Sequence, residues 1–472
     1  MQRRQILKTL GLSALASSIL GQSVSGQSVL GEWAQAASAP VASGGWQNWS
    51  KSLAPSKADV ETPQTTADLI RLLQTTKGAV RPVGSGHSWT PLVPAGDDGK
   101  IVRLDAFNGV RSLDKTKQTA WLGAGARLKD LSPALAEQGL AFRNLGDIDV
   151  QSLAGATSTA THGTGKNLPC LAAEIKGLKL ITGAGEEMEF SANSNANLLP
   201  AAQVALGTLG VLTEIEMQLV PRHKLHRRVR FMPYPQVLAE AENMWQAHRN
   251  FEFFYIPFSG TAMVITHDET DAPETPRATN ESDESDDGVM QLKALRDYLG
   301  WFPFLRKRLL GAAIANAPEE NIIGESWQLL ASARNVHFNE MEYHLPPEVA
   351  LDVLDEVRDL IEREHPDVFF PFECRMTAAD TAWLSPFNAG PRVSVAVHTH
   401  APDAYDFLFT KIEPIFQRAG GRPHWGKLNS LSGAQVRALY PKFDDFAKLR
   451  SELDPDNRLL NPYLRELFGA TS

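Results

Sequence analysis

Residues 81–89 read Arg81-Pro82-Val83-Gly84-Ser85-Gly86-His87-Ser88-Trp89. The pattern predicts a strand that enters a tight glycine turn and presents a histidine at its tip. Gly84 and Gly86 permit backbone angles and a close approach that other residues do not tolerate. Backbone N–H groups exposed in such a turn form a nest for a pyrophosphate. The segment therefore predicts a nucleotide-cofactor site at His87, and a plain turn with an incidental histidine is the alternative.

Helical and strand patterns alternate on both sides of this turn. Residues 66–74 have helical spacing, residues 79–83 and 101–104 look like strands, and residues 121–125 form a short apolar strand pattern. A leucine stripe at helical spacing follows, formed by Leu128, Leu131, Leu135 and Leu140. The alternation predicts an α+β domain. No strand pattern leads into G-x-G-x-x-G, so the dinucleotide signature of a Rossmann fold is missing.

A second glycine-rich segment covers residues 144–165. It reads Asn144-Leu145-Gly146-Asp147-Ile148-Asp149-Val150-Gln151-Ser152-Leu153-Ala154-Gly155-Ala156-Thr157-Ser158-Thr159-Ala160-Thr161-His162-Gly163-Thr164-Gly165. Small residues let the backbone approach a planar ring, and hydroxyl groups can bond phosphate or ring heteroatoms. The imidazole of His162 could chemically form a covalent bond to a cofactor, as could that of His87. We expect a local hydrogen bond as the role of His162. A third segment with two glycines spans residues 205–215.

The three segments resemble, in order and spacing, those of the sugar-lactone and alditol oxidases. This D-arabinono-1,4-lactone oxidase-like group is part of the vanillyl-alcohol-oxidase family of flavoproteins. The resemblance implies a two-domain α+β fold, in which an FAD-binding domain is joined to a substrate or cap domain with a mainly antiparallel sheet. It also implies FAD attached covalently through His87. The residues implied for the cofactor are Arg81, Pro82, Val83, Gly84, Ser85, Gly86, His87, Ser88, Gly146, Asp147, Ser152, Gly155, Ala156, Thr159, Thr161, His162, Gly163, Gly207, Gly210, Val211, His424 and Lys427.

Three segments nearer the C-terminus carry the expected chemistry. Glu373 and Arg375 alternate on a predicted strand and therefore share a face, as do His398 and His400 on another. Pro423-His424-Trp425-Gly426-Lys427 follows. In the resembled group, a Glu-x-Arg pair and a His-Trp-Gly-Lys segment line the active site. The resemblance thus implies catalytic Glu373, Arg375 and Lys427, with Ser152, His398 and His400 binding substrate.

Oxidation of an alcohol removes a proton from oxygen and a hydride from carbon, and the expected hydride acceptor is flavin N5. We expect Arg375 and Glu373 to hold the reacting hydroxyl, Glu373 to help remove its proton, and Lys427 to stabilise the cofactor's charge or bond the hydroxyl. The expected substrate is a polyol or sugar lactone, and electrons pass to oxygen or another acceptor. The motifs separate neither lactone from open polyol nor oxidase from dehydrogenase.

Three alternatives stay open from the residues alone. Glu373 and Arg375 fit a solvated ion pair on an edge strand. His398 and His400, with Glu373 or His424, fit a zinc or non-haem iron site and hence a metal-dependent enzyme. A redox-partner flavoprotein without its own small substrate is the third alternative.

The N-terminus indicates export. Arg3-Arg4 precedes an apolar segment at 10–20, and Ala34-Gln35-Ala36 offers a cleavage site, as in a twin-arginine signal. The expected location is the periplasm or beyond, reached through the twin-arginine machinery. The apolar segment is shorter than the roughly 20 residues that span a bilayer, so stable membrane insertion is not expected.

Composition bounds the remaining chain. The net charge of −9 argues against a nucleic-acid partner, and Cys170 and Cys374, the only cysteines, are expected to be free thiols. The acidic stretch 268–288 predicts a mobile surface excursion, and residues 290–317 predict a covering helix. The expected division is a signal at 1–36, an FAD-binding domain at 46–221, a substrate domain at 222–420, and a segment at 421–472 that completes the active site and the FAD domain.

Overall fold

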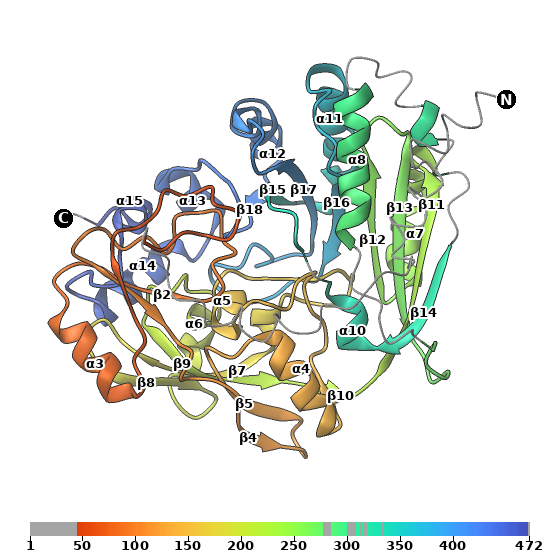
Figure 1. Ribbon diagram of the computed structural model, residues 1–472. Helices are drawn as coiled ribbons and strands as arrows, with labels where there is room; N and C mark the ends of the chain where they lie inside the picture. The colour runs from red at the N-terminus through yellow and green to blue at the C-terminus, as the bar shows by residue number, and fades with distance from the viewer. Residues whose placement is uncertain are drawn as a thin grey trace, which may run out of the picture.

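The computed structural model describes residues 45–276, 285–299, 308–311, 314, 319–332 and 334–470 (Figure 1). The expected export signal at 1–36 lies outside the described residues. In the part of the chain that is described, no helix is long and apolar enough to cross a membrane.

The N-terminal part contains two main sheets that share one core. A parallel sheet has the order β1-β3-β2, and an antiparallel sheet has the order β4-β5-β9-β7-β8. Their strands are β1 (Asp59–Glu61), β2 (Val80–Val83), β3 (Lys100–Arg103), β4 (Val110–Asp114), β5 (Thr119–Gly123), β7 (Ile175–Ile181), β8 (Glu187–Ser191) and β9 (Val211–Gln218). A short pair joins β6 (Leu140–Ala141) and β10 (Val220–Pro221).

Short helices cover these sheets. They are α3 (Thr66–Thr75), α4 (Leu128–Glu137), α5 (Leu153–Ser158) and α6 (Leu199–Gln203), with 3₁₀ turns at Leu171–Glu174 and Ala196–Leu198. A capping box starts α3, because the Thr65 side chain accepts from the Asp68 N–H and the Asp68 carboxylate accepts from the Thr65 N–H. Leu128, Leu131 and Leu135 of α4 are buried in the same core, which confirms the expected amphipathic helix for these three residues. Leu140, the fourth leucine of the expected stripe, is buried too but lies in β6, because the helix ends at Glu137.

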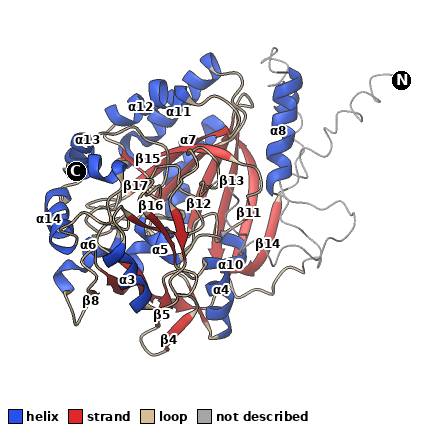
Figure 2. Cartoon of the chain, turned by 60° about the vertical axis from the view of Figure 1, so that its left-hand side comes forward, coloured by secondary structure: helices blue, strands red, loops and turns tan. Residues whose placement is uncertain are grey.

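The second part is built on one eight-stranded antiparallel sheet (Figures 1 and 2). Its order from one edge to the other is β14 (Glu320–Glu325), β11 (Lys224–Pro233), β13 (Thr261–Glu269), β12 (Asn250–Ile256), β16 (Phe372–Thr377), β17 (Arg392–His400), β15 (Phe338–Leu345) and β18 (Arg422–Pro423). Because side chains alternate along a strand, each strand presents one set to each face.

One face of this sheet is a second hydrophobic core. Phe253, Cys374 and Val395 pack there beneath α7 (Tyr234–Ala247), α11 (Pro347–Glu364) and a π-helical turn at Leu408–Ile412 that leads into α12 (Glu413–Arg418). Figure 2 shows these helices along one side of the sheet and the N-terminal part along the other. The opposite face carries buried charged residues, among them Glu252, Glu373 and Arg375. We call this second surface the charged face.

The last elements return to the N-terminal core. Helices α13 (Gly433–Leu439), α14 (Phe443–Leu453) and α15 (Pro462–Phe468) contribute Val436, Phe446 and Leu464 to it. The Val80 N–H of β2 donates to the Arg458 carbonyl at 2.7 Å. The chain end therefore helps to position the strand that leads into the glycine turn.

Several element boundaries differ from the expectation. The strand expected at 121–125 ends at Gly123, since the Gly125 N–H turns away to donate to the Phe107 carbonyl at 2.8 Å. The acidic stretch 268–288 is not one excursion, because β13 continues to Glu269 and α8 (Ser285–Leu299) begins inside the stretch; residues 277–284 lie outside the described residues.

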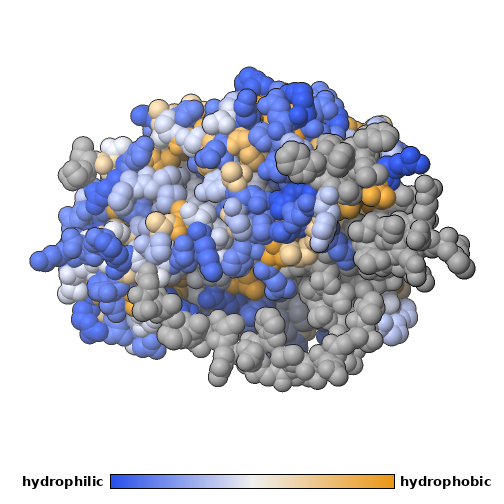
Figure 3. Space-filling view, turned by 45° about the horizontal axis from the view of Figure 1, so that its top comes forward, coloured by the Kyte–Doolittle hydropathy of each residue, from blue (hydrophilic) through white to orange (hydrophobic). Residues whose placement is uncertain are grey.

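The helix expected at 290–317 starts earlier, as α8, and residues 300–307 lie outside the described residues. Its Leu292 packs with Ile256 and Phe370, so α8 acts as a covering helix. Both cysteines are buried and free, as expected. The described surface drawn in Figure 3 is mainly hydrophilic, with small hydrophobic groups between hydrophilic residues.

Candidate active site

A narrow pocket lies between the glycine turn after β2, the segment 151–159 and the turn at 206–212. Its volume is about 100 Å³, and its lining includes Gly84, Gly86, Gly155, Gly207 and Gly210. Gly86 and Gly207 have φ values of +73° and +65°, which favour glycine. A Cβ on Gly84 would lie 2.2 Å from Ser152 Oγ. This slot of backbone and small side chains fits the extended nucleotide part of FAD.

Arg81 holds the walls of this pocket together. Its buried guanidinium donates to the carbonyls of Leu92, Leu206, Gly207 and Leu459 at 2.6–2.8 Å. These bonds join β2 to Leu92 in the following loop and to two segments that are remote in the sequence. Arg81 also lines the narrow pocket, so it both supports the pocket walls and borders the site expected for the cofactor.

A second cavity of about 660 Å³ continues from the narrow pocket and lies against the charged face. Four residues line both: His87, Ser88, Gln151 and Thr159. His87 stacks on Trp49 with ring centroids 5.0 Å apart. Burial, reinforced by the charges of Lys427 and Arg127, lowers the pKa of His87 to about 4. The imidazole at the junction is therefore neutral and nucleophilic at physiological pH.

Glu373 and Arg375 project from β16 into the large cavity. Arg375 Nε lies 2.9 Å from Glu373 Oε1, and Arg375 Nη1 lies 2.9 Å from Asp147 Oδ1. The strand lies between β12 and β17, and both side chains are buried, which contradicts the alternative of a solvated pair on an edge strand. Burial outweighs the opposing charge of Arg375 and raises the pKa of Glu373 well above its usual value.

A raised pKa means that Glu373 binds a proton more readily than an ordinary carboxyl group, so it suits both acceptance of the hydroxyl proton and a hydrogen bond to a substrate oxygen. Asp147 is a second carboxyl partner of Arg375. Although burial alone would raise the pKa of Asp147, the charge of Arg375 lowers it.

Lys427 joins the same cavity from the loop after β18. Its Nζ donates to Glu340 on β15 and lies 4.6 Å from the centroid of the Trp89 ring. His398 Nε2 lies 3.5 Å from Glu340 Oε1, and His398 Nδ1 lies 3.1 Å from the Pro371 carbonyl oxygen. Although burial would raise the pKa of Glu340, Lys427 and His398 lower it to about 2.

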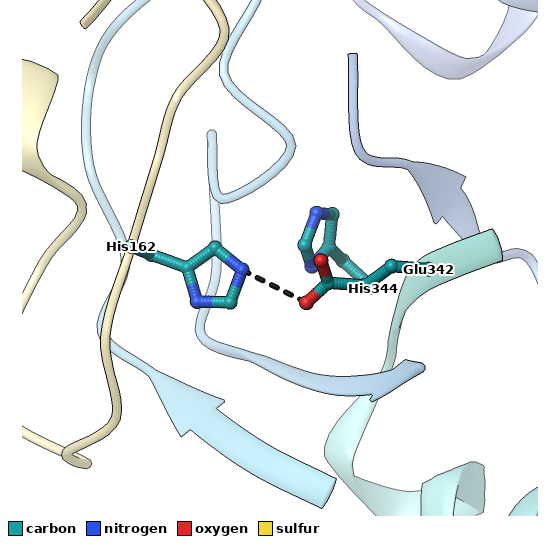
Figure 4. A group of neighbouring side chains, drawn as sticks. All are labelled: His162, Glu342 and His344. Carbon is teal, nitrogen blue, oxygen red and sulfur yellow. Dashed lines mark hydrogen bonds and ion pairs between the residues drawn. The ribbon is translucent and has the colours of Figure 1, made fainter. Parts of the chain in front are cut away.

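His162 takes part in a buried pair with Glu342 (Figure 4). Its Nε2 lies 3.0 Å from Glu342 Oε1, and its Nδ1 lies 2.9 Å from the Gly163 carbonyl oxygen. Although burial would raise the pKa of Glu342, His162 and Arg375 lower it well below its usual value. The local hydrogen bond expected for His162 is present, and the contact with β15 is an addition that links the two domains.

The positions of His398 and His400 give little support to the alternative of a metal site formed by this pair. Among the described residues, the groups with metal-ligand spacing are His162–Glu342–His344, Glu340–Glu373–His398 and Asp147–Glu252–Glu373. None includes His400, whose Nδ1 lies 3.6 Å from Asp403 Oδ1. His398 and His400 therefore do not converge on one centre.

Most predicted site residues border the two cavities. The narrow pocket is lined by Arg81, Pro82, Val83, Gly84, Ser85, Gly86, His87, Ser88, Ser152, Gly155, Thr159, Gly207 and Gly210. The large cavity is lined by His87, Ser88, Gly146, Asp147, Thr159, Thr161, His162, Glu373, Arg375, His398, His424 and Lys427. Neither lining includes Ala156, Gly163, Val211 or His400, and Ser152 borders only the narrow pocket, where its side chain caps α5.

Sequence reasoning missed the carboxylates on two strands of the charged face. Glu340, Glu342 and His344 alternate with Met341 and Tyr343 along β15. That period of two places the three polar residues on one face. This alternation of polar and apolar residues can be read from the sequence, and it would have predicted a strand with one polar face. Glu252 on β12 also lines the cavity and pairs in register with Arg375.

Glu252 predicts a measurable pH dependence of stability. Burial and the charge of Asp147 raise its pKa from 4.5 to about 8. Between these values the folded protein binds a proton that the unfolded chain has released, so stability falls as pH rises. Glu252→Gln should reduce the slope of the free energy of unfolding against pH by up to ~1.4 kcal/mol per pH unit. Urea unfolding at pH 5 to 8 measures this free energy. Glu137→Gln, at an exposed position, is the control. If the free energies of Glu252→Gln and wild type changed in parallel with pH, the raised pKa of Glu252 would be contradicted.

Family models match most of the described chain. A model described as D-arabinono-1,4-lactone oxidase matches residues 215–467, and one described as FAD binding domain matches residues 58–191. The chain is 32% identical to an L-gulono-1,4-lactone dehydrogenase of Mycobacterium tuberculosis over 90% of its length and 99% of that protein. It is 28% identical to an alditol oxidase of Streptomyces sp., over 89% of this chain and 98% of the relative.

A solved structure shares the fold. Cholesterol oxidase from B. sterolicum superposes with a TM-score of 0.74 at 17% identity, covering 90% of this chain and 96% of that one. At this identity the likeness shows the fold alone. The comparisons confirm the expected family resemblance, the two-part vanillyl-alcohol-oxidase-type fold and FAD as cofactor.

Proposed function

Because the chain belongs to the D-arabinono-1,4-lactone oxidase family, we propose that it oxidises an alcohol carbon of a sugar lactone or alditol in the large cavity. It is an FAD-dependent oxidoreductase that acts on CH–OH groups. One observation carries the proposal: the glycine-lined pocket opens at His87 into the cavity that contains Glu373, Arg375 and Lys427. A redox-partner flavoprotein without a small substrate would not need that cavity.

FAD, when bound, supplies the acceptor for the substrate hydride. The residues that would hold it are the glycines of the narrow pocket, the turn at His87 and the segment 159–162. Arg375 orients the reacting hydroxyl through its guanidinium N–H groups and stabilises alkoxide character. Glu373, whose pKa is raised by burial, bonds a substrate oxygen from the same strand face.

The proton of the hydroxyl passes to His398 in this mechanism. The mechanism uses the tautomer of His398 in which the proton is on Nδ1, 3.1 Å from the Pro371 carbonyl oxygen, so that Nε2 can accept the proton. Ionised Glu340, 3.5 Å from that Nε2, stabilises the imidazolium that forms. Lys427, on the other side of Glu340, supplies positive charge near the junction with the cofactor pocket. With the hydroxyl proton on His398, the substrate would become a carbonyl compound once bound FAD accepted its hydride.

Anaerobic titration of the purified protein tests this function. Alditols and aldonolactones should bleach the flavin absorbance near 450 nm, and oxygen or an artificial acceptor should restore it. Comparing the two substrate classes and the two acceptor classes separates lactone from alditol oxidation and oxidase from dehydrogenase. A flavin that no compound of either class reduces would contradict the proposal.

Covalent attachment through His87 is part of the proposal. A neutral buried imidazole at the junction supports it. Acid precipitation of the wild-type protein should leave the yellow colour in the pellet, on the peptide that contains His87. His87→Ala should release at least ~90% of its flavin into the supernatant, since a non-covalent cofactor is lost when the fold is lost. His162→Ala is the control and should keep the covalent bond to the flavin. Release of the yellow colour from the wild-type protein would contradict covalent attachment.

Export by the twin-arginine route completes the proposal. The motif Arg3-Arg4 and the cleavage site at 34–36 support it. This route carries folded proteins, so FAD can be inserted before export. Replacing both arginines by lysine should retain the protein in the cytoplasm with its flavin, as measured by cell fractionation. Export that is unchanged by the replacement would argue for another route.

A further inference from the structure

The large cavity extends well beyond the residues that the proposed reaction uses. Its extension lies over β13 and β11 and is walled by apolar side chains: Val229, Phe254, Met263 and Ile265 from the sheet, with Leu329 and Leu330 from α10 (Ser326–Leu330) opposite. We call this part of the cavity the apolar arm. Figure 1 shows α10 below the end of the sheet where these strands lie.

The four sheet residues of the apolar arm belong to neither main hydrophobic core. Val229 and Ile265 form a separate small cluster, against which Phe254 and Met263 pack. Phe254 and Met263 remain partly exposed, although they lie on the charged face beside the cavity. Apolar surface gathered in a cavity, outside the packed core, is typical of a ligand site.

The apolar arm is long compared with a sugar ring. The strand order places β12, β13 and β11 successively beyond β16, the strand of Arg375. With neighbouring strands ~4.8 Å apart, Val229 on β11 lies about 14 Å from Arg375 across the sheet. A hydroxylated ring or short polyol bound at Arg375 would leave the far part of the arm unfilled.

Two ionisable side chains beside the apolar arm have contacts within the protein. Arg227 pairs with Glu320 across β11 and β14. His267 Nε2 lies 3.2 Å from the Leu329 carbonyl oxygen, and burial lowers the pKa of His267 to about 3. The pairing and the neutral imidazole favour an uncharged apolar occupant over an ionised one.

We propose that the preferred substrate carries an apolar alkyl or aryl group, which lies in the apolar arm while its hydroxylated part lies at Arg375, Glu373 and Lys427. This inference rests on the proposed function and names a narrower substrate class: amphipathic polyols or lactones. The apolar group supplies binding free energy at a distance from the reacting carbon and leaves the chemical step unchanged.

Anaerobic stopped-flow reduction of the flavin tests the proposal with one polyol series. The series consists of an alditol and its terminal methyl, propyl, hexyl and octyl ethers. The apparent dissociation constant should fall by roughly twofold to fourfold per methylene until the arm is filled, with a constant limiting rate of reduction. Val229→Trp, which fills the arm, should remove the dependence and leave reduction by the free alditol unchanged.

Two further variants keep the test independent of folding defects. Met263→Gln makes the wall polar without adding volume and should weaken the dependence on chain length. Val110→Trp places the same indole on an exposed strand of the other domain and should preserve the dependence. Flavin content, read from absorbance, confirms that each variant is folded.

Three results would overturn the proposal. Reduction that does not depend on chain length would leave the apolar arm without a role in substrate binding, while the proposed function stands. A dependence seen only when alkyl quinones reoxidise the flavin, and lost in Val229→Trp, would assign the arm to the electron acceptor. A flavin that neither the alditol nor its ethers reduce would contradict the proposed function and this inference with it.

Discussion

Arg375→Lys is expected to lower kcat/KM for the substrate by ~10²–10³-fold, the usual cost of removing one aligned donor from the charge that develops in a reaction. Lysine keeps the positive charge among Asp147, Glu342 and Glu373, so the buried carboxylates stay compensated. It cannot reproduce the planar fork of donors that holds Glu373 and Asp147 together. The loss should therefore fall mainly on kcat, with the flavin still bound.

Steady-state kinetics and the flavin spectrum measure this outcome together. Arg222→Lys is a matched control, because Arg222 makes a two-point contact with Glu325 at 2.9 and 2.7 Å and does not line the cavity. The control should keep full activity. If the activity of Arg375→Lys stayed within threefold of wild type, the proposed contact between Arg375 and the reacting hydroxyl would be contradicted for any substrate.

Gly84→Val is expected to abolish stable flavin binding. The added Cβ would lie 2.2 Å from Ser152 Oγ, so Ser152 must leave its position at the start of α5. Loss of that helix cap costs ~1 kcal/mol, and overpacking of the pocket wall costs a further ~1–3 kcal/mol. Each 1.4 kcal/mol lost from non-covalent binding of FAD is a factor of ten in affinity, and the proposed bond to His87 forms from that bound state, so the flavin content should fall at least ~10-fold.

The ratio of flavin to protein absorbance after purification measures this loss. Gly390→Val is the control, since no atom lies within 4 Å of a Cβ built there. The control should purify with the wild-type flavin content. Gly84→Val protein that is folded by circular dichroism and fully yellow would show that the narrow pocket does not hold the nucleotide.

Most residues of the narrow pocket could be predicted because they lie in two contiguous segments of the sequence. Residues 81–89 and 144–165 each contain the glycines, hydroxyl groups and histidine that shape their own turn. Local conformation depends on local composition there, so the pattern indicates the pocket without knowledge of the remaining chain. The comparisons with known proteins support the cofactor that the pattern implied.

Residues whose partners are remote in sequence were interpreted less well. Arg81 was expected to contact the cofactor and does line the narrow pocket, but its bonds to carbonyls at positions 206, 207 and 459 were not predicted. His400 shares a strand face with His398, but the strand leaves the cavity before it reaches His400. Glu373 was expected to help remove a proton, and the burial that raises its pKa comes from the packing of the two parts of the chain, which the sequence does not show.

The sequence by itself determined the family, the FAD-binding segments and the pairing of Glu373 with Arg375 on one strand face, because short motifs and the period of two contain that information. Only the tertiary structure decided which carboxylates surround Arg375, that His398 stands beside Glu340, and that an apolar arm continues from the reacting site. The physical reason is that the order of strands in the eight-stranded sheet, and the packing of its charged face against the FAD-binding part, bring together residues more than 200 positions apart, such as Asp147 and Arg375.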